Sequence, residues 1–162
     1  MHVGTKVGLA VLFLTGALWA QSNSLMGIWK LNSAQSTFDP GPPPKSVTVK
    51  YEPHGKDGVR ITVDTIDARG ILTHAVYTAK YDGKDNAVKG DSSRDTVALK
   101  RIDPYTMEVT NKERGKVTTI NTIIVSKDGR TRTDTIRGTN SQGQRVNNVA
   151  VFEKQQGFSV KN

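Results

Sequence analysis

The sequence predicts an all-β fold, a single antiparallel up-and-down (meander) β-barrel of about nine or ten strands. Turn signals recur along the chain, most of them 12 to 14 residues apart, which leaves room for one short strand between turns. Between the turns, apolar and polar residues alternate, as they do in strands with one buried face. The turn signals are Lys56-Asp57-Gly58, Ala68-Arg69-Gly70, Tyr81-Asp82-Gly83, Asp103-Pro104, Glu113-Arg114-Gly115, Lys127-Asp128-Gly129 and Ser141-Gln142-Gly143.

Residues 1–20 are predicted to be a secretory signal peptide, with the single barrel domain following over residues 21–162. A basic start at Lys6 precedes an apolar run over residues 7–14 and then small residues, and cleavage after Ala20 or after Ala17 fits this layout. The apolar run is shorter than the roughly 20 residues that a membrane-spanning helix needs. The mature protein is therefore expected to be secreted or periplasmic, and not membrane-spanning.

The composition argues against a nucleic-acid partner. The chain has 23 Lys and Arg against 15 Asp and Glu, a net charge of +8, and removing the leader with its one lysine leaves +7. The basic residues are spread along the chain with acids between them, whereas a nucleic-acid surface gathers them on one face. A solvated basic surface is the first interpretation, and attraction to an anionic surface is the alternative. Because the chain has no cysteine, disulfides and thiolate metal sites are excluded.

The first strand of the domain is expected to begin at Gly27-Ile28-Trp29. Three consecutive prolines, Pro42 to Pro44, then stiffen the chain before the second strand. Residues 33–45 are predicted to form a long loop over the open end of the barrel, and long loops in compact domains are often functional. Phe38 is the large apolar side chain available to cover the mouth of a cavity. The alternative is that Phe38 packs on the outer wall.

The following strands show clear apolar faces that are expected to line the interior. A short, weakly marked strand is expected near Ala87-Val88, and the other strands alternate with period two. Because nearly all connections are short hairpins, nearest-neighbour antiparallel order is favoured over a Greek-key sandwich. The predicted inward sets are Val47, Val49 and Tyr51; Val59, Ile61 and Val63; Ala75, Tyr77, Ala79 and Tyr81; Val97 and Leu99; Met107 and Val109; and Val149 and Val151.

The strands near the C-terminus predict a partly polar interior. In "RTRTDTIR" the charged residues Arg130, Arg132 and Asp134 alternate with Thr131, Thr133 and Thr135. Since burying charges costs more than burying hydroxyls, the three threonines are predicted to face inward. Asn121 shares a face with Val117, Thr119, Ile123 and Val125. Either Asn147 or Asn148 must also point in. Two interiors remain open, namely a cavity that holds water or a ligand and a narrow barrel whose polar groups satisfy one another.

Closing the meander into a barrel removes the exposed edges of the sheet. Closure brings the first strand beside the last, so the strand of Trp29 is expected to pair with "RVNNVAVFEK", residues 145–154.

Gly27-Ile28-Trp29 at the start of such a meander resembles the Gly-x-Trp motif of the lipocalin and avidin-like superfamily, the calycins. The resemblance implies that Gly27 permits close backbone approach, that Trp29 lies across the closed end, and that Lys154 covers its ring through a cation–π contact. The segments "GIWKLN", "GPPPKS", "YDGKD", "LKRID", "VSKDG" and "VNNVAVFEK" are similar to a group of small secreted bacterial lipocalin-like proteins. The resemblance covers nearly all of residues 25–155 and implies a fold without an activity. The Arg-x-Tyr pair with which fatty-acid-binding proteins hold a carboxylate is absent from the last strand.

No catalytic, metal or cofactor site is predicted, because nucleophile motifs are missing and His54 and His74 have no ligand at metal-site spacing. The predicted function is non-catalytic binding or carriage of a small, largely apolar ligand in the barrel cavity. The alternative is a structural or envelope-associated module whose basic surface binds anionic lipid or glycan. The candidate ligand-binding residues are Phe38, Tyr77, Tyr81, Asn121, Thr131, Thr133 and Thr135.

Overall fold

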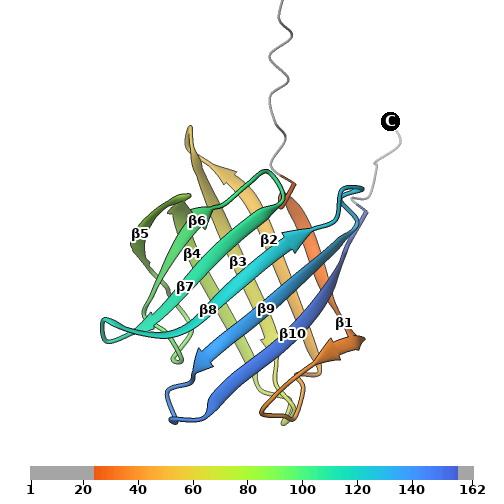
Figure 1. Cartoon of the computed structure of the whole chain (residues 1–162), viewed down its shortest axis with the longest axis vertical. Coiled ribbons are helices and arrows are strands. Elements are labelled where there is room, and N and C mark those ends of the chain that lie inside the picture. Colours follow the sequence, from red (N-terminus) through yellow and green to blue (C-terminus); the bar gives the residue numbers. More distant parts are fainter. Residues whose placement is uncertain (1–23, 157–162) are drawn as a thin grey trace, which may run out of the picture.

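The computed structural model describes residues 24–156, which form ten antiparallel strands wound into one barrel (Figure 1). This confirms the predicted up-and-down β-barrel. The predicted signal peptide lies outside the described residues. In the sheet, hydrogen-bonded neighbours follow the order β4-β3-β2-β1-β10-β9-β8-β7-β6-β5. The strands are β1 (Gly27–Thr37), β2 (Ser46–His54), β3 (Gly58–Ile66), β4 (Leu72–Lys80), β5 (Asp82–Ala87), β6 (Thr96–Arg101), β7 (Thr106–Glu113), β8 (Lys116–Val125), β9 (Thr131–Thr139) and β10 (Arg145–Lys154).

The first and last strands lie side by side, as the closure argument predicted (Figure 1). β1 pairs with β10 so that Trp29 faces Lys154 and Leu31 faces Phe152. Every other ladder joins strands that are consecutive in the chain. The pairing of β1 with β10 is therefore the one non-local ladder among the ten strands.

The barrel is nearly closed and keeps one seam, between β4 and β5. These two strands stand at the ends of the sheet order, and an isolated bridge between Val76 and Lys89 joins the two sides with backbone hydrogen bonds of 2.9 and 3.0 Å. Next to the bridge, Gly90 has a φ of 82°, and a Cβ there would lie 2.0 Å from the carbonyl oxygen of His74. Only glycine allows this approach of the two sides.

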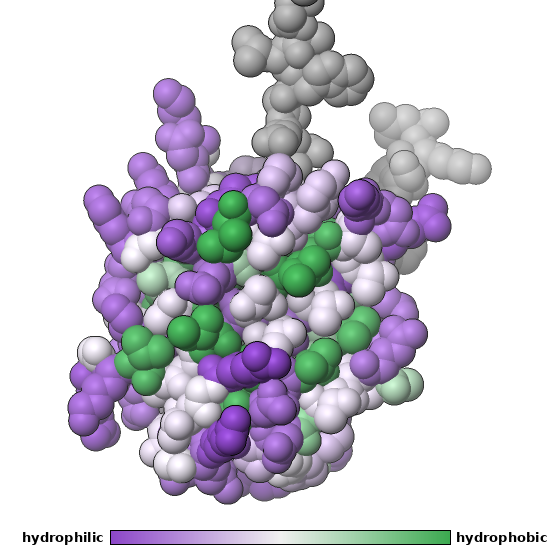
Figure 2. Space-filling model, in the orientation of Figure 1, coloured by the Kyte–Doolittle hydropathy of each residue, from purple (hydrophilic) through white to green (hydrophobic). Residues whose placement is uncertain are grey.

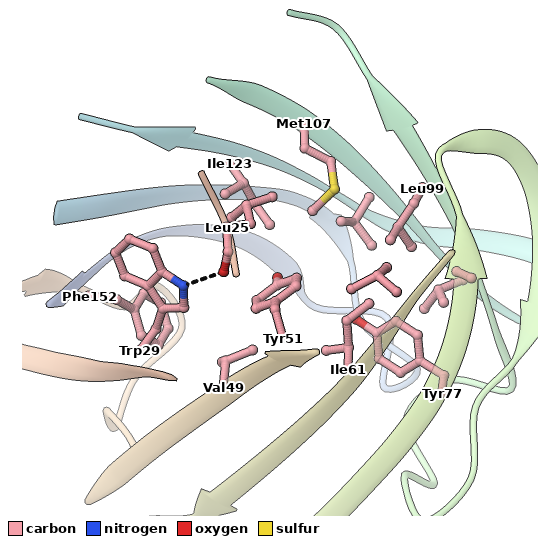
Figure 3. Packing of buried hydrophobic residues seen from close by; sticks show 14 of the residues in the cluster. Leu25, Trp29, Val49, Tyr51, Ile61, Tyr77, Leu99, Met107, Ile123 and Phe152 are labelled. Atoms are coloured by element: carbon pink, nitrogen blue, oxygen red, sulfur yellow. Dashed lines mark hydrogen bonds between the residues drawn. The ribbon is translucent and has the colours of Figure 1, made fainter. Parts of the chain in front are cut away.

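Trp29 occupies the closed end of the barrel and is fully buried (Figure 3). Its indole Nε1 donates a 2.8 Å hydrogen bond to the carbonyl oxygen of Leu25, and Lys154 Nζ lies 5.1 Å from the ring centroid. Partial burial lowers the pKa of Lys154, which also donates to the carbonyl oxygen of Ser24 at 3.2 Å. A Cβ on Gly27 would stand 3.1 Å from Lys154 Cε. The cation–π contact implied between Lys154 and Trp29 is confirmed, and the group that lies close to Gly27 is the Lys154 side chain.

The residues predicted to face inward on β2, β3, β4, β6 and β7 also meet in the core. The predictions of which residues face inward on β9 and β10 were wrong. On β9, Arg132 and Asp134 are the inward residues, each 3% exposed, so Thr131, Thr133 and Thr135 lie on the outer face. On β10, Ala150 and Phe152 are buried, whereas Val149 is 38% exposed. Of the two asparagines, Asn148 is half-buried and Asn147 is exposed.

The long loop predicted over residues 33–45 is shorter in the structure. β1 continues to Thr37 through an irregularity between Asn32 and Thr37, so the connection to β2 covers residues 38–45. Backbone and side-chain contacts hold its start against β10. The Asp39 N–H donates to Asn148 Oδ1 at 2.8 Å, and the Asn147 N–H donates to the Asp39 carbonyl oxygen at 2.7 Å.

The outer surface in the view of Figure 2 shows apolar residues as separate spots among polar ones. Ile120 and Ile124 of β8 belong to the exposed apolar residues, with threonines and charged residues beside them on β7 and β9. No helix within residues 24–156 is long and apolar enough to cross a membrane.

Candidate functional site

A cavity of about 160 Å³ lies inside the barrel. Most of its wall is apolar. Both halves of the sheet contribute to it, through the inward faces of β1, β2, β3, β4, β7, β8, β9 and β10. Six further lining residues are polar or charged, namely Tyr51, Tyr77, Arg94, Asn121, Arg132 and Asp134. The apolar lining consists of Leu31, Phe38, Val47, Val49, Val63, Val109, Ile123, Ile136, Ala150 and Phe152.

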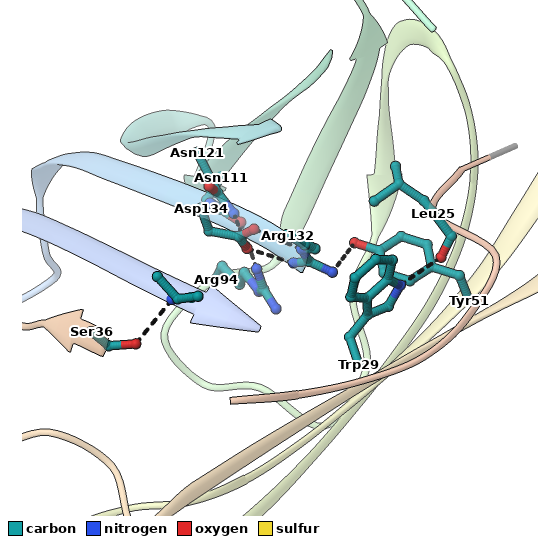
Figure 4. Close-up of polar contacts among 10 residues, drawn as sticks. Leu25, Trp29, Ser36, Tyr51, Arg94, Asn111, Asn121, Arg132 and Asp134 are labelled. Atoms are coloured by element: carbon teal, nitrogen blue, oxygen red, sulfur yellow. Dashed lines mark hydrogen bonds and ion pairs between the residues drawn. The ribbon is translucent and has the colours of Figure 1, made fainter. Parts of the chain in front are cut away.

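A buried ion pair forms one side of this cavity (Figure 4). Arg132 and Asp134 stand two residues apart on β9 and so share its inner face. Arg132 Nε donates to Asp134 Oδ1 at 2.6 Å, and Nη2 donates to Oδ2. The bidentate geometry is the strongest form of this ion pair. The barrel tolerates these two charges because each side chain neutralises the other.

Aromatic neighbours complete the surroundings of Arg132. Its Nη1 donates a 3.0 Å hydrogen bond to the Tyr51 hydroxyl oxygen, and the guanidinium lies 4.8 Å from the Phe152 ring centroid. Burial by itself would lower the pKa of Arg132, but Asp134 and Tyr51 outweigh burial and raise it. Burial raises the pKa of Tyr51 well above its usual range, against the opposing pull of Arg132. Arg132 is therefore charged and Tyr51 neutral at any physiological pH.

Asn121 of β8 extends this network toward the open end. Its Nδ2 donates to Asp134 Oδ2 at 3.2 Å (Figure 4). Its other amide atom, Oδ1, is buried and has no hydrogen-bond partner within residues 24–156. Asn121 thus presents an unpaired acceptor inside the barrel, as part of a network that is otherwise satisfied.

A second charged group, Arg94, enters from the connection between β5 and β6. Its Nη1 donates to Asn111 Oδ1 at 2.6 Å, and its Nε lies 3.0 Å from Asp91 Oδ2, an ion pair without hydrogen-bond geometry. The guanidinium stands 5.7 Å from the ring centroid of Tyr77, whose pKa is raised by burial. Arg94 therefore has its own counter-ion and does not compete with Arg132 for Asp134.

A more polar hollow of about 420 Å³ adjoins the cavity. Arg94, Asn121 and Ile136 line both spaces, so these three residues mark their junction. The interior therefore changes from an apolar floor to a polar mouth at the end opposite Trp29. The other residues around the mouth are Thr65, Asp91, Ser93, Asn111, Thr118, Thr119, Asn140, Ser141 and Asn148.

The structure brings three of the seven predicted ligand-binding residues to the cavity, namely Phe38, Tyr77 and Asn121. Phe38 packs against the core and lines the cavity, which decides against the outer-wall alternative. Tyr81 lies elsewhere in the core, with the Arg101 guanidinium 4.3 Å from its ring centroid.

Thr131, Thr133 and Thr135 do not line the cavity, because they lie on the outer face of β9. Their inward prediction treated each charge of "RTRTDTIR" as isolated, although Arg132 and Asp134 neutralise one another. Sequence reasoning therefore missed Arg132 and Asp134, and it also missed Arg94. The i, i+2 spacing of opposite charges on one strand face was the signal that could have identified the pair.

No family model and no curated protein matches the sequence. Among solved structures, the barrel is similar to the crystal structure of a mutant of the fluorescent protein UnaG, with a TM-score of 0.51 and 12% sequence identity. The match covers 83% of this chain and 98% of that chain. At this identity the likeness concerns the fold alone, and it supports a lipocalin-like barrel.

Proposed function

We propose that this protein binds a small, largely apolar molecule inside its barrel, without catalysis, as a secreted or periplasmic carrier. The observation that carries the proposal is the cavity of about 160 Å³ with its mainly apolar wall. Apolar protein cavities of about this size, roughly 150 Å³, take up benzene. The polar side chains beside the cavity bond mostly to one another, so they do not extend into the cavity.

Binding of toluene tests the proposal. We expect toluene to raise the melting temperature of the wild-type protein, because a ligand that binds only the folded state stabilises it by mass action. Ala150 is buried and lines the cavity, so Ala150→Leu should fill part of the space and abolish the shift. Ala87→Leu adds the same atoms at an exposed position on β5 and should keep the shift.

Circular dichroism of both variants checks that the barrel is intact. A wild-type protein without any response to toluene, or a filled variant with an unchanged response, contradicts binding in this cavity. Salt-sensitive binding to anionic vesicles in place of toluene would favour the envelope-associated module, since exposed charges act through screened electrostatics.

The location is tested separately from the binding. Export of the native gene product should yield a chain that begins at Gln21 or Leu18, according to the two cleavage sites compatible with the leader. An intact mass that still includes residues 1–17 would contradict secretion.

A further inference from the structure

The charged groups of the interior are balanced. Arg132 pairs with Asp134, and Arg94 pairs with Asp91. Within residues 24–156, these four are the ionised side chains that line the cavity and its mouth. A charged ligand would add an uncompensated charge to this space, at a high desolvation cost. The interior therefore favours a neutral ligand.

Asn121 supplies an unpaired hydrogen-bond acceptor in this interior. The Asp134 carboxylate accepts hydrogen bonds and donates none, so the Asn121 amide must turn its NH₂ group toward Asp134. This orientation leaves Oδ1 as a buried acceptor without a donor among the described residues. A buried polar atom without a partner is costly, and a ligand with an O–H or N–H group would satisfy it.

The two adjoining spaces limit the size of the ligand. The apolar space holds about 160 Å³, close to what a single six-membered ring requires. Beyond Asn121 the walls become polar, with Asn111, Thr119 and Asn148 among them. A long hydrocarbon chain would have to pass through this polar mouth, where its burial brings little gain. The apolar part of the ligand is therefore compact.

From these three observations we infer that the ligand is a neutral, ring-sized apolar molecule with one hydrogen-bond donor, such as a phenol or a cyclic alcohol. The ring lies against the apolar wall formed by residues such as Val49, Ile123 and Phe152, and the donor bonds to Asn121 Oδ1. This inference rests on the proposed function, whose cavity it uses, and it adds the chemical class of the ligand.

Three probes with the same ring separate the possibilities. p-Cresol has the ring and a donor, toluene has the ring alone, and p-toluate has the ring and a negative charge. By calorimetric titration we expect p-cresol to bind about five- to tenfold more tightly than toluene, which corresponds to one added net hydrogen bond. We expect p-toluate to bind more weakly than toluene, and a saturated long-chain fatty acid to show no binding.

Substitution of Asn121 tests the assigned acceptor. Asn121→Leu should reduce the affinity for p-cresol to that for toluene, while toluene itself keeps its affinity. Asn147→Leu makes the same change at an exposed position on β10 and should preserve the preference for p-cresol. Should the leucine variant fail to fold, Asn121→Ala removes the acceptor without adding bulk, and the ratio of the two affinities gives the same information.

The outcomes distinguish this inference from the proposed function. If the wild-type protein binds p-cresol and toluene equally, the donor assignment is wrong and the cavity proposal stands. If p-toluate binds best, charge balance does not govern selection and the inference fails. If none of the ring probes binds, the proposed function fails together with the inference. A preference for p-cresol that survives in both Asn121 variants overturns the assignment to Asn121.

Discussion

Arg132 keeps its charge inside the barrel because its neighbours replace the water that it has lost. The carboxylate of Asp134 supplies the counter-charge, the Tyr51 hydroxyl accepts a further hydrogen bond, and the Phe152 ring offers its face to the guanidinium. Buried pairs of this kind contribute little net stability but are expensive to break. The network therefore acts as a unit, and its parts are best tested together.

We predict that Arg132→Met lowers the free energy of unfolding by about 3 to 5 kcal/mol, because it leaves Asp134 as an unpaired buried charge. The double variant Arg132→Met/Asp134→Leu should recover most of this loss. Urea denaturation followed by circular dichroism measures both, with Arg130→Met at an exposed site just before β9 as the control. Equal destabilisation in the single and double variants would show that the charge of Asp134 is not the cause.

The inward position of Arg132 could have been derived from a different set of residues. Lys154 opposite Trp29 places every second residue of β10 on the inner face, including Phe152 and Ala150. The tight turn before β10 then sets Phe152 opposite Arg132. The prediction that Val149 and Val151 face inward was inconsistent with that of Lys154. The two valines were assigned to the inner face only because they are apolar, but single apolar residues are also common on protein surfaces.

At the scale of single elements, three hairpin turns depend on a carboxylate. Asp67, Asp103 and Asp128 each accept backbone N–H bonds across their own turn. The pKa of each is lowered, most strongly by the N–H of Ile71 for Asp67, by the N–H of Tyr105 for Asp103, and by the Ser126 hydroxyl for Asp128. The turn signals of the sequence thus have a definite physical basis, since aspartate bonds its own following backbone.

We predict that stability falls in acid as these turns lose their charge. A lowered pKa in the folded state means that each carboxylate stabilises the fold above its unfolded pKa, near 4, and that this contribution disappears as pH falls through the folded pKa. Unfolding free energies measured between pH 6 and pH 2 should show the loss. Asp67→Asn should make the acid dependence shallower, whereas Asp57→Asn, at an exposed position in the turn between β2 and β3, should leave it unchanged. The opposite ranking of the two variants would contradict the assignment to Asp67.

For the whole molecule, the barrel was predictable from the sequence and its cavity was not. Alternation and turn spacing are local signals, so they indicated the strands and their neighbours before any tertiary contact was known. The volume that remains inside depends on how side chains from eight strands meet, and the position of Arg94 depends on the conformation of the connection between β5 and β6. The sequence predicted three lining residues without any knowledge of packing. Tyr77 and Asn121 were assigned to the inner face from the alternation along their strands, and Phe38 was assigned from the long connection after the first strand.

The seam between β4 and β5 makes this chain suited to circular permutation. The Gln155 N–H bonds to the carbonyl oxygen of Ile28, so a short glycine–serine linker in place of residues 1–23 and 157–162 can join the end of β10 to the start of β1. New termini between Tyr81 and Asp82 then give the chain order β5 through β10 followed by β1 through β4, the order of the strands in the sheet. Every ladder becomes local, and folding rates rise as contacts become more local.

We predict that this permutant refolds faster than the native chain in stopped-flow experiments while keeping its barrel. A second permutant with termini between Asp128 and Gly129 is the matched control, because it converts the pairing of β8 with β9 into a new non-local ladder. Equal refolding rates for the two permutants would mean that the order of the strands along the chain does not limit folding. If only the first permutant refolds faster than the native chain, the pairing of β1 with β10 limits the folding rate of the native chain.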